Sequence, residues 1–373
     1  MPEDEREPNQ AQTTAATART PSRQLLSSLR KLAPGTAFRE GLESILRART
    51  GALIVVGEAM AERGLLDGGF KLGIDLTPSH LYELSKMDGA IITNADASRI
   101  LYANVQLLPD PAIPSGETGI RHRTAERTAR QTGDLVVAIS QRRNVITLYQ
   151  GTVKYVLKDV SVILAKANQA VQTMEKYRGI LEAVLTNLSA LELEDLVTLA
   201  DVVTVIQRSE MLLRIESEVE GYITELGTEG RLVGMQAQEL AGDVASNYYL
   251  TIRDYCLPPE PGVAEHGRPE LGALSSEDLL DPAIIGRIIG YPPAPGFLDR
   301  PVTPRGYRIL SQIPRLPAGV IDNLVDAFGQ LPRTVSASIE ELDAVDGIGE
   351  VRAKAIKDGL RRLRDKVIID RQM

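Results

Sequence analysis

The chain has 373 residues, and at roughly 150 residues per domain this length predicts two or three domains rather than one small one. Forty-two Lys and Arg against fifty Asp and Glu give a net charge of −8, which excludes a generally basic nucleic-acid coat, so any polyanion site must be local. The 43% hydrophobic and 25% charged residues are typical of a globular protein, and the 4% aromatic content, with no Trp, argues against a base-stacking platform.

Cysteine and histidine are too sparse for a disulfide or zinc framework. The single Cys256 cannot form an intrachain disulfide or a thiolate zinc cage, and His80 and His266 have no partner at zinc-ligand spacing. No apolar run approaches the roughly 20 residues of a membrane-spanning helix, and the first residues lack a signal-peptide core. We therefore expect a cytoplasmic protein without a membrane partner.

The N-terminal third predicts a disordered tail followed by an α/β domain. Residues 1–23 are polar and hold three Pro, so they are expected to be disordered. The domain, over residues 24–159, begins with two short helices, and its strands are separated by short turns that favour a mixed sheet over a Rossmann sheet. The expected helices span 23–32, 36–48 and 124–132, and the expected strands span 52–57, 70–74, 89–93, 99–105, 134–140, 144–149 and 153–157.

The sequence of residues 160–373 predicts helices. An all-α spine over residues 160–304 contains long helical patterns at 161–189, 193–226 and 229–253. Its segment 190–243 carries twelve acidic and three basic residues, a poor surface for DNA. The Pro- and Gly-rich stretch 257–274 is expected to be mobile, and residues 305–373 are expected to form a small all-α domain of short helices.

One constellation in the α/β domain indicates phosphate chemistry. Arg121, His122 and Arg123 stand directly before Thr124 and a helical segment, so cations, a hydroxyl and free backbone N–H groups gather at a helix N-terminus. Residues 119–158 carry eight basic and two acidic side chains. Asp88, followed by Gly89 at the start of a strand, offers a carboxylate suited to Mg²⁺ or Mn²⁺.

These motifs, DGA at 88–90 and ETGIRHRTAER at 117–127, resemble the diadenylate cyclase family, whose members condense two ATP molecules into cyclic di-AMP. With ANVQLLPDP, the RRN turn, PRGYRILSQIPRLP and DAVDGIGE, the resemblance extends from about residue 25 along nearly the whole chain, to members that carry a C-terminal helix-hairpin-helix domain.

The resemblance implies residue roles. Asp88 would hold the catalytic metal beside the attacking ribose 3′-hydroxyl, and Gly89 would approach the nucleoside. Leu107 would pack on adenine. The phosphates would be bound by the side chains of Arg121, His122, Arg123, Thr124 and Ser140 and by the backbone of Ile120. Two departures reduce the expected phosphate contacts: Ile120 replaces a usual Thr, and Gln141 replaces a frequent Arg.

The implied mechanism needs two sites that face each other, since each holds one ATP and each 3′-hydroxyl must meet the partner's α-phosphate. The family also implies a homo-octamer, and branched DNA as a partner that lowers cyclase output.

A second constellation, LDAVDGIGEVRAKAI at 342–356, resembles a helix-hairpin-helix. Gly347 and Gly349 would let the hairpin backbone approach a DNA phosphate, and Arg352 and Lys354 would add positive charge. Such contacts ignore base sequence. An earlier stretch resembles a second copy, with its hairpin expected at 316–319 and without the paired glycines.

The expectation is a diadenylate cyclase coupled to DNA-structure sensing near the nucleoid. One alternative is a junction-binding scaffold whose pocket binds ATP without reaction, which Ile120 and Gln141 allow. Another is a nucleotidyltransferase that acts on DNA ends. This sequence lacks the paired carboxylates that such two-metal enzymes usually have.

Overall fold

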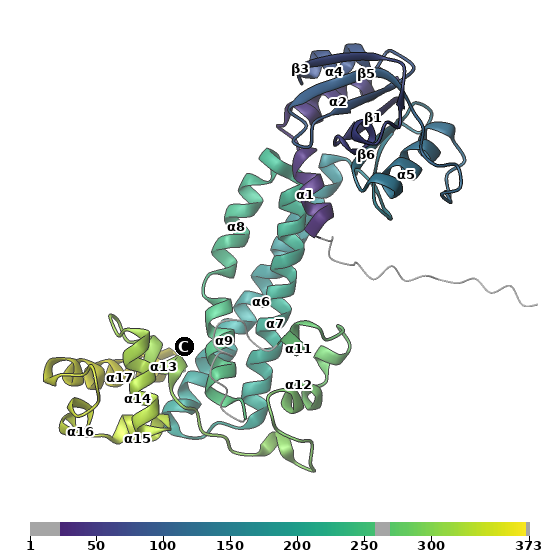
Figure 1. Ribbon diagram of the computed structural model, residues 1–373. Coiled ribbons are helices and arrows are strands. Elements are labelled where there is room, and N and C mark those ends of the chain that lie inside the picture. The colour runs from purple at the N-terminus through teal and green to yellow at the C-terminus, as the bar shows by residue number, and fades with distance from the viewer. Residues whose placement is uncertain (1–22, 258–268, 371–373) are drawn as a thin grey trace, which may run out of the picture. The chain divides into compact units, whose positions relative to one another are not determined.

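The computed structural model describes residues 23–257 and 269–370 (Figure 1). The described residues form two compact units that divide between Leu157 and Lys158. The predicted disordered tail lies outside the described residues except for Arg23, as does the central part of the stretch predicted to be mobile. Within the described part of the chain, no helix combines the length and apolar character needed to cross a bilayer.

The first unit contains one mixed sheet flanked by helices, which confirms the predicted fold class. Neighbouring strands follow the order β2-β5-β4-β1-β6-β7-β8, and β3 also pairs with β5. Only β1 and β4 pair in parallel among the pairings described, and the others are antiparallel. The elements are α1 (Arg23–Lys31), α2 (Ala37–Arg47), β1 (Ala52–Val56), α3 (Ala59–Glu62), β2 (Leu66–Asp67), β3 (Phe70–Asp75), α4 (Pro78–Leu84), β4 (Ala90–Thr93), β5 (Arg99–Leu107), α5 (Ile120–Thr132), β6 (Leu135–Ser140), β7 (Val145–Gln150) and β8 (Val153–Val156).

Both faces of this sheet are covered, which explains why its central strands are apolar throughout. Ile54 and Val137 face a core shared with α1, α2 and α4. Val55 and Val136, one position away, face a second core shared with α3 and α5. Because side chains alternate along a strand, the run ALIVV supplies both layers, and α5 is held against the second face.

The second unit is all-helical. Its first helix has 35 residues and ends at Asp195, whose φ of 56° stops the helix. Thr198 and Asp201 then form a capping box that starts the next one. The helices are α6 (Val160–Glu194), α7 (Leu199–Leu226), η1 (Gly227–Gly230), α8 (Arg231–Ala241), α9 (Val244–Tyr255), α11 (Pro269–Gly272), η2 (Asp278–Leu280), α12 (Pro282–Ile288), η3 (Phe297–Asp299), α13 (Tyr307–Ser311), α14 (Ala318–Phe328), α15 (Leu331–Ser336), α16 (Ile339–Asp343) and α17 (Glu350–Asp370).

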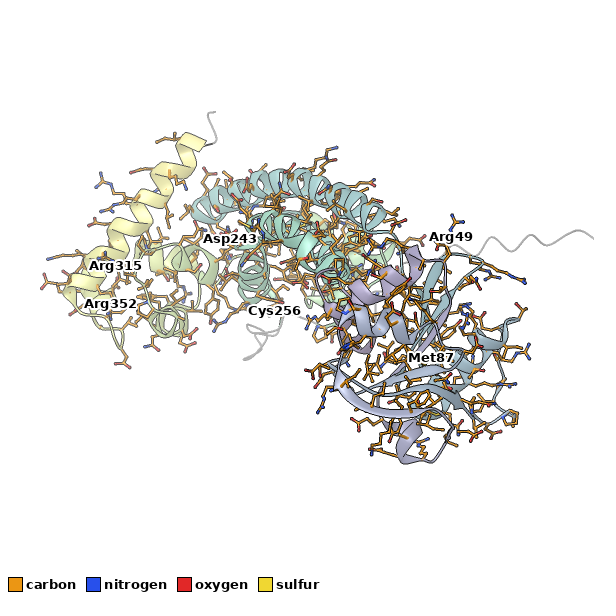
Figure 2. The ribbon with its side chains drawn as sticks, turned by 90° about the horizontal axis from the view of Figure 1, so that it is seen from above. Arg49, Met87, Asp243, Cys256, Arg315 and Arg352 are labelled. Carbon is orange, nitrogen blue, oxygen red and sulfur yellow. The ribbon has the colours of Figure 1, made fainter. Side chains whose placement is uncertain are left out.

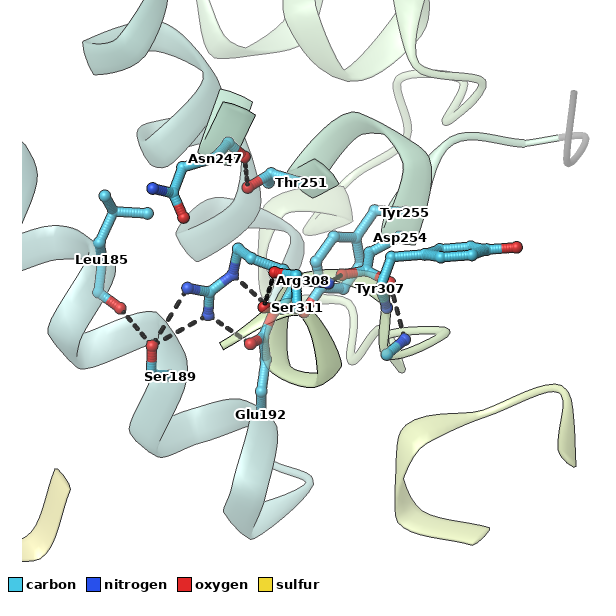
Figure 3. Close-up of polar contacts among 11 residues, drawn as sticks. Leu185, Ser189, Glu192, Asn247, Thr251, Asp254, Tyr255, Tyr307, Arg308 and Ser311 are labelled. Carbon is cyan, nitrogen blue, oxygen red and sulfur yellow. Dashed lines mark hydrogen bonds and ion pairs between the residues drawn. The ribbon is translucent and has the colours of Figure 1, made fainter. Parts of the chain in front are cut away.

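A buried polar network ties the C-terminal helices to α6 and α9 (Figure 3). Asp254 accepts hydrogen bonds from the backbone N–H groups of Gly306, Tyr307 and Arg308 at 2.7, 2.7 and 2.9 Å. The Arg308 guanidinium, 1% exposed, pairs with Glu192. Burial, and then the charge of Glu192, raise the pKa of Asp254 to about 7, although the three N–H donors favour its ionised form.

Four predicted helix boundaries are wrong. The long helix continues to Glu194 instead of ending at 189, because the residue that leaves the helical conformation is Asp195. The next helix therefore begins at Leu199 rather than at 193. The helix predicted over 229–253 is interrupted at Gly242, whose φ of 38° favours glycine. Helix α5 begins at Ile120 rather than Thr124, with Gly119 as its N-cap.

Candidate functional site

A pocket of about 450 Å³ opens at the N-terminus of α5 and is lined by residues 117–122 and 140–143. Gly119 makes no side-chain cap bond, so the first N–H groups of the helix stay available to an anion. Arg121, Arg142 and Arg143 supply positive charge, and all three are exposed. The composition and position of the pocket suit a polyphosphate.

Strand register brings other predicted site residues to the same edge of the sheet. Because β1 and β4 are parallel, Asp88, which precedes β4, lies at the edge where β1 begins. Antiparallel pairing of β5 with β4 and of β6 with β1 places Leu107 and Ser140 at that edge too. The topology therefore gathers side chains that are far apart in the sequence, as the resemblance implied.

Arg121 is seated against a glycine. Its Nη1 donates weakly to the carbonyl oxygen of Ile139, at 3.5 Å. A Cβ added to Gly51 would lie 2.0 Å from that Nη1 and 2.7 Å from Cζ. The absence of a side chain at the start of β1 is thus what gives the guanidinium its place beside the pocket.

His122 belongs to a chain of hydrogen-bonded side chains that joins it, through Tyr149, to Glu117 of the pocket wall. Its Nδ1 lies 2.9 Å from the Tyr149 hydroxyl, which donates to Glu117 Oε1 at 2.8 Å. Lys154 Nζ pairs with the same oxygen at 2.5 Å. Burial would raise the pKa of Glu117, but the hydrogen bonds from Lys154 and Tyr149 outweigh it and the pKa is lowered.

Unlike Arg121 and His122, Arg123 turns away from the pocket and toward the preceding loop. Its guanidinium donates to the carbonyl oxygens of Glu117 and Thr118 at 3.3 and 3.4 Å, and it does not line the pocket. Thr124 is likewise absent from the lining. The triplet therefore divides: Arg121 and His122 face the pocket, while Arg123 fastens the loop that precedes α5.

The same loop is held by further side chains of α5. Arg127 Nε donates to the Ile113 carbonyl at 2.8 Å, and Arg130 Nη1 donates to the Pro114 carbonyl at 2.9 Å. Glu126 accepts from the backbone N–H of Gly116 at 3.1 Å. These contacts, with those of Arg123, fix the position of Glu117 at the pocket wall.

Asp88 is exposed, and no hydrogen bond or ion pair holds its carboxylate among the residues that the structure describes. Its neighbour Met87, labelled in Figure 2, is 40% exposed.

Gly89 has a packing role: its N–H donates to Asn104 Oδ1 at 3.1 Å, and a Cβ there would lie 2.3 Å from the Asn104 backbone. Leu107, 7% exposed, packs in the core beneath α3 and α5.

Four residues in or beside the pocket had no role predicted from the sequence. The pair Arg142-Arg143 belongs to the RRN turn after Ser140, which entered the resemblance only as a motif and was not assigned to phosphate binding. It brings positive charge beside Gln141, where the expected arginine is missing. Tyr149 and Lys154 had no local signal, because they reach Glu117 only through the pairing of β7 with β8.

The predicted C-terminal hairpin forms between α16 and α17. Gly347 adopts a φ of 76°, which only glycine adopts without strain, and a Cβ added to Gly349 would meet open space. The side chain of Arg352 donates to the Gly347 carbonyl. Lys354 pairs with Glu350 at 2.6 Å, so a carboxylate at the helix start offsets part of its charge.

The first hairpin repeats this geometry 32 residues earlier, between α13 and α14. Arg315, exposed and with a φ of 63°, occupies the position of Gly347, and Pro317 occupies that of Gly349. The hairpin expected at 316–319 is displaced, because Ala318 already begins α14. Arg315 and Arg352 are both labelled in Figure 2.

Comparisons with known proteins agree with this arrangement. Residues 39–153 match the family model described as DisA bacterial checkpoint controller nucleotide-binding, and residues 157–297 match the DisA bacterial checkpoint controller linker region. Proteins named DNA integrity scanning protein DisA from Symbiobacterium thermophilum and Carboxydothermus hydrogenoformans are each 58% identical, over 92% of this chain and 97% of theirs. The one from Clostridium kluyveri is 55% identical over 93% of this chain and 98% of its own. These matches confirm the family that the motifs indicated.

Proposed function

Since the chain belongs to the DisA family, which joins a nucleotide-binding domain to a linker region, we propose that it is a diadenylate cyclase that converts two ATP into cyclic di-AMP and two pyrophosphates. The observation that carries this proposal is the pocket at the α5 N-terminus, where Arg121, His122 and free helix N–H groups meet. The pocket shares its sheet edge with Asp88, a carboxylate that the described residues leave unpaired.

The donor set fits one hard divalent cation held jointly with the nucleotide. No cluster of three or more His, Cys, Asp or Glu occurs within residues 23–257 and 269–370. A lone exposed carboxylate is nevertheless what Mg²⁺ uses when substrate phosphates and waters fill its other positions. Asp88 would hold Mg²⁺ or Mn²⁺, which when bound would neutralise phosphate charge and acidify the 3′-hydroxyl.

The protein's own contribution is positioning and electrostatic stabilisation. The ribose 3′-oxygen forms a bond to the α-phosphorus of the partner's ATP while the bond to pyrophosphate breaks, and the 3′-hydroxyl loses its proton. Arg121, with Arg142 and Arg143 at the pocket rim, stabilises the negative charge on the departing pyrophosphate. The α5 N–H groups and Ser140 orient the triphosphate, and Leu107 and Gly89 shape the nucleoside end.

Two such events close the ring, so two sites must face each other. We propose a homo-oligomer, an octamer by analogy with the family, in which facing first units complete each other's reaction. The acidic segment 190–243 suits this arrangement as a spacer rather than a DNA surface.

The C-terminal hairpins are proposed to bind branched DNA through its backbone, at the nucleoid, and so to lower cyclase output. The left-handed Gly347, the open approach at Gly349 and the exposed Arg352 support this assignment. The rival reading is a junction-binding scaffold with an inactive ATP pocket; the exposed Ile120, which offers no hydroxyl, is the observation that favours it.

Product analysis tests the proposal. The purified chain is incubated with ATP and Mg²⁺ or Mn²⁺, with and without a four-way DNA junction, and the products are chromatographed. A cyclase forms cyclic di-AMP, more slowly with the junction. A scaffold binds ATP and returns it unchanged, and an enzyme acting on DNA ends instead extends the DNA.

A further inference from the structure

The charge of Glu117 fixes the direction of each hydrogen bond in the chain Glu117–Tyr149–His122, whose two end residues line the pocket. Glu117 is held ionised by Lys154, so its carboxylate only accepts hydrogen bonds. The Tyr149 hydroxyl must therefore donate its single hydrogen to Glu117 Oε1, at 2.8 Å. Its oxygen can then only accept from His122, whose Nδ1 lies 2.9 Å away.

This ordering determines the state of the histidine. A neutral imidazole carries one N–H, and here that hydrogen is on Nδ1. The other ring nitrogen, Nε2, then carries a lone pair and has no partner within the described residues. Since His122 lines the pocket, a bare lone pair is what an entering phosphate oxygen would meet at this position, and two acceptors repel each other.

We propose, on the basis of the cyclase function proposed above, that Glu117 and Tyr149 are positioning residues that fix the Nδ1–H tautomer of His122, so that Nε2 takes up one proton from solvent when the triphosphate binds. The protonated ring then donates from Nε2 to a phosphate oxygen and from Nδ1 to Tyr149. Its positive charge lies between the triphosphate and the Glu117 carboxylate.

The charges around His122 agree with a ring that is neutral before ATP binds. Burial lowers the pKa of His122; Glu117 in the preceding loop raises it, and Arg121 on α5, Lys154 on β8 and Arg143 in the turn after β6 lower it. A bound triphosphate would reverse this balance, because its negative charges favour the imidazolium. ATP affinity should then fall as the pH rises, since protonation becomes part of binding.

Calorimetric titration of the full chain measures this proton. The probe is 3′-deoxy-ATP with Mg²⁺, which lacks the attacking hydroxyl and cannot react. Titrations at about pH 8, well above the ordinary histidine pKa of about 6.5, are run in buffers with different ionisation enthalpies, and the dependence of the measured heat on the buffer gives the protons taken up. Wild-type protein should take up close to one proton per bound nucleotide, with affinity falling toward tenfold per unit of rising pH.

Three variants separate the contributions. Tyr149→Phe frees Nδ1, so a neutral ring can bind phosphate through Nε2–H; uptake should fall below half a proton and the pH dependence should flatten. Glu117→Gln keeps an oxygen acceptor for Tyr149 but removes the charge, so the fall in affinity should move to lower pH. Tyr102→Phe removes a hydroxyl that makes no hydrogen bond within the described residues, and should match wild type.

The outcomes separate a failure of the tautomer proposal from a failure of the proposed cyclase function. Wild-type binding without proton uptake, or Tyr149→Phe binding with uptake as in wild type, contradicts the inference even if the enzyme makes cyclic di-AMP. The wild-type measurement stands alone if a variant fails to fold. If ATP and 3′-deoxy-ATP both fail to bind and no cyclic di-AMP forms, the proposed function itself fails.

Discussion

Among single residues, the arrangement of the pocket at the α5 N-terminus depends on a position with no side chain. Gly51 gives the Arg121 guanidinium its place, and a Cβ there would displace it. We expect Gly51→Ala to fold normally, because the obstructing atoms are the far end of a flexible side chain. It should weaken ATP binding by about tenfold, the size of one lost charge-assisted hydrogen bond. Gly116→Ala, in open space beside the same helix, is the matched control in a nucleotide titration; equal affinities for the two variants would refute the role of Gly51.

The Arg-His-Arg triplet beside a helix start predicts a phosphate site there, and the structure has a pocket at that position. The triplet does not show how its three side chains are oriented, and Arg123 turns toward the loop carbonyls of Glu117 and Thr118. The contacts of Tyr149 and Lys154 with Glu117 span more than thirty residues of sequence, so only the folded sheet reveals them.

At the scale of elements, the two glycines of the C-terminal hairpin have different roles. Gly347→Ala places a side chain at a φ of 76°, which costs about 1–2 kcal/mol and should lower both thermal stability and DNA affinity. Gly349→Ala meets open space, so it should cost less stability than Gly347→Ala, with only the loss of a favourable N-cap residue. The added methyl group would obstruct a DNA phosphate at the proposed surface. Melting curves and junction gel shifts compare the two variants. A Gly349→Ala protein with wild-type junction affinity would show that phosphate does not approach there.

The negative charge of Glu350 at the start of α17 predicts a substitution that raises DNA affinity instead of lowering it. Glu350 pairs with Lys354 at 2.6 Å beside the hairpin, where its carboxylate would repel DNA bound at the proposed surface. Glu350→Gln should therefore raise junction affinity by a few fold and steepen its dependence on salt, because Lys354 becomes available to phosphate. The check is a salt series of binding isotherms, with Glu340→Gln as the comparison. An affinity unchanged at every salt concentration would place the DNA away from this helix start.

Element type was predictable, and element boundaries were less so. Alternating and continuous apolar runs identified every strand of the first unit except the two-residue β2, because burial on both faces of the sheet leaves a strong signal. The short helices α3 and α4 were not predicted, since few residues carry their pattern. The α5 start was misplaced because Gly119 caps it without a side-chain hydrogen bond, so no Ser, Thr or Asp marked it. The end of α6 was misplaced because it depends on the αL conformation of Asp195, which no Gly or Pro marks in the sequence.

At the scale of the whole molecule, the predicted boundary at 304/305 crosses a buried network. Arg308 pairs with Glu192 where both side chains are at most 2% exposed. Arg308→Met should cost about 3–5 kcal/mol in unfolding free energy, because it leaves a buried carboxylate unpaired. Adding Glu192→Met should recover most of that loss. Denaturant unfolding of both proteins checks this; a double variant as unstable as the single one would mean that packing, not charge, causes the loss.

The same network affects how DNA binding can be separated from catalysis. A chain that ends at residue 304 would lose Arg308, which pairs with Glu192, and the backbone N–H groups that Asp254 binds. Deletion would therefore disturb the long helices as well as remove the hairpins. The hairpin variants Gly349→Ala and Glu350→Gln change the proposed DNA surface while leaving this network intact, so they isolate its effect on cyclase output.

The most direct test of the proposed condensation is the stoichiometry of its products. Purified wild-type chain is incubated with ATP and Mg²⁺, and cyclic di-AMP and pyrophosphate are quantified in the same sample, beside Asp88→Asn protein of matched oligomeric state. Condensation in facing sites predicts two pyrophosphates for each cyclic di-AMP. Turnover by Asp88→Asn should be less than about a tenth of that of the wild type, because the substitution removes the charge proposed to bind the metal with almost no change in volume. ATP that stays bound and unreacted in the wild type, or undiminished synthesis by Asp88→Asn, would contradict it.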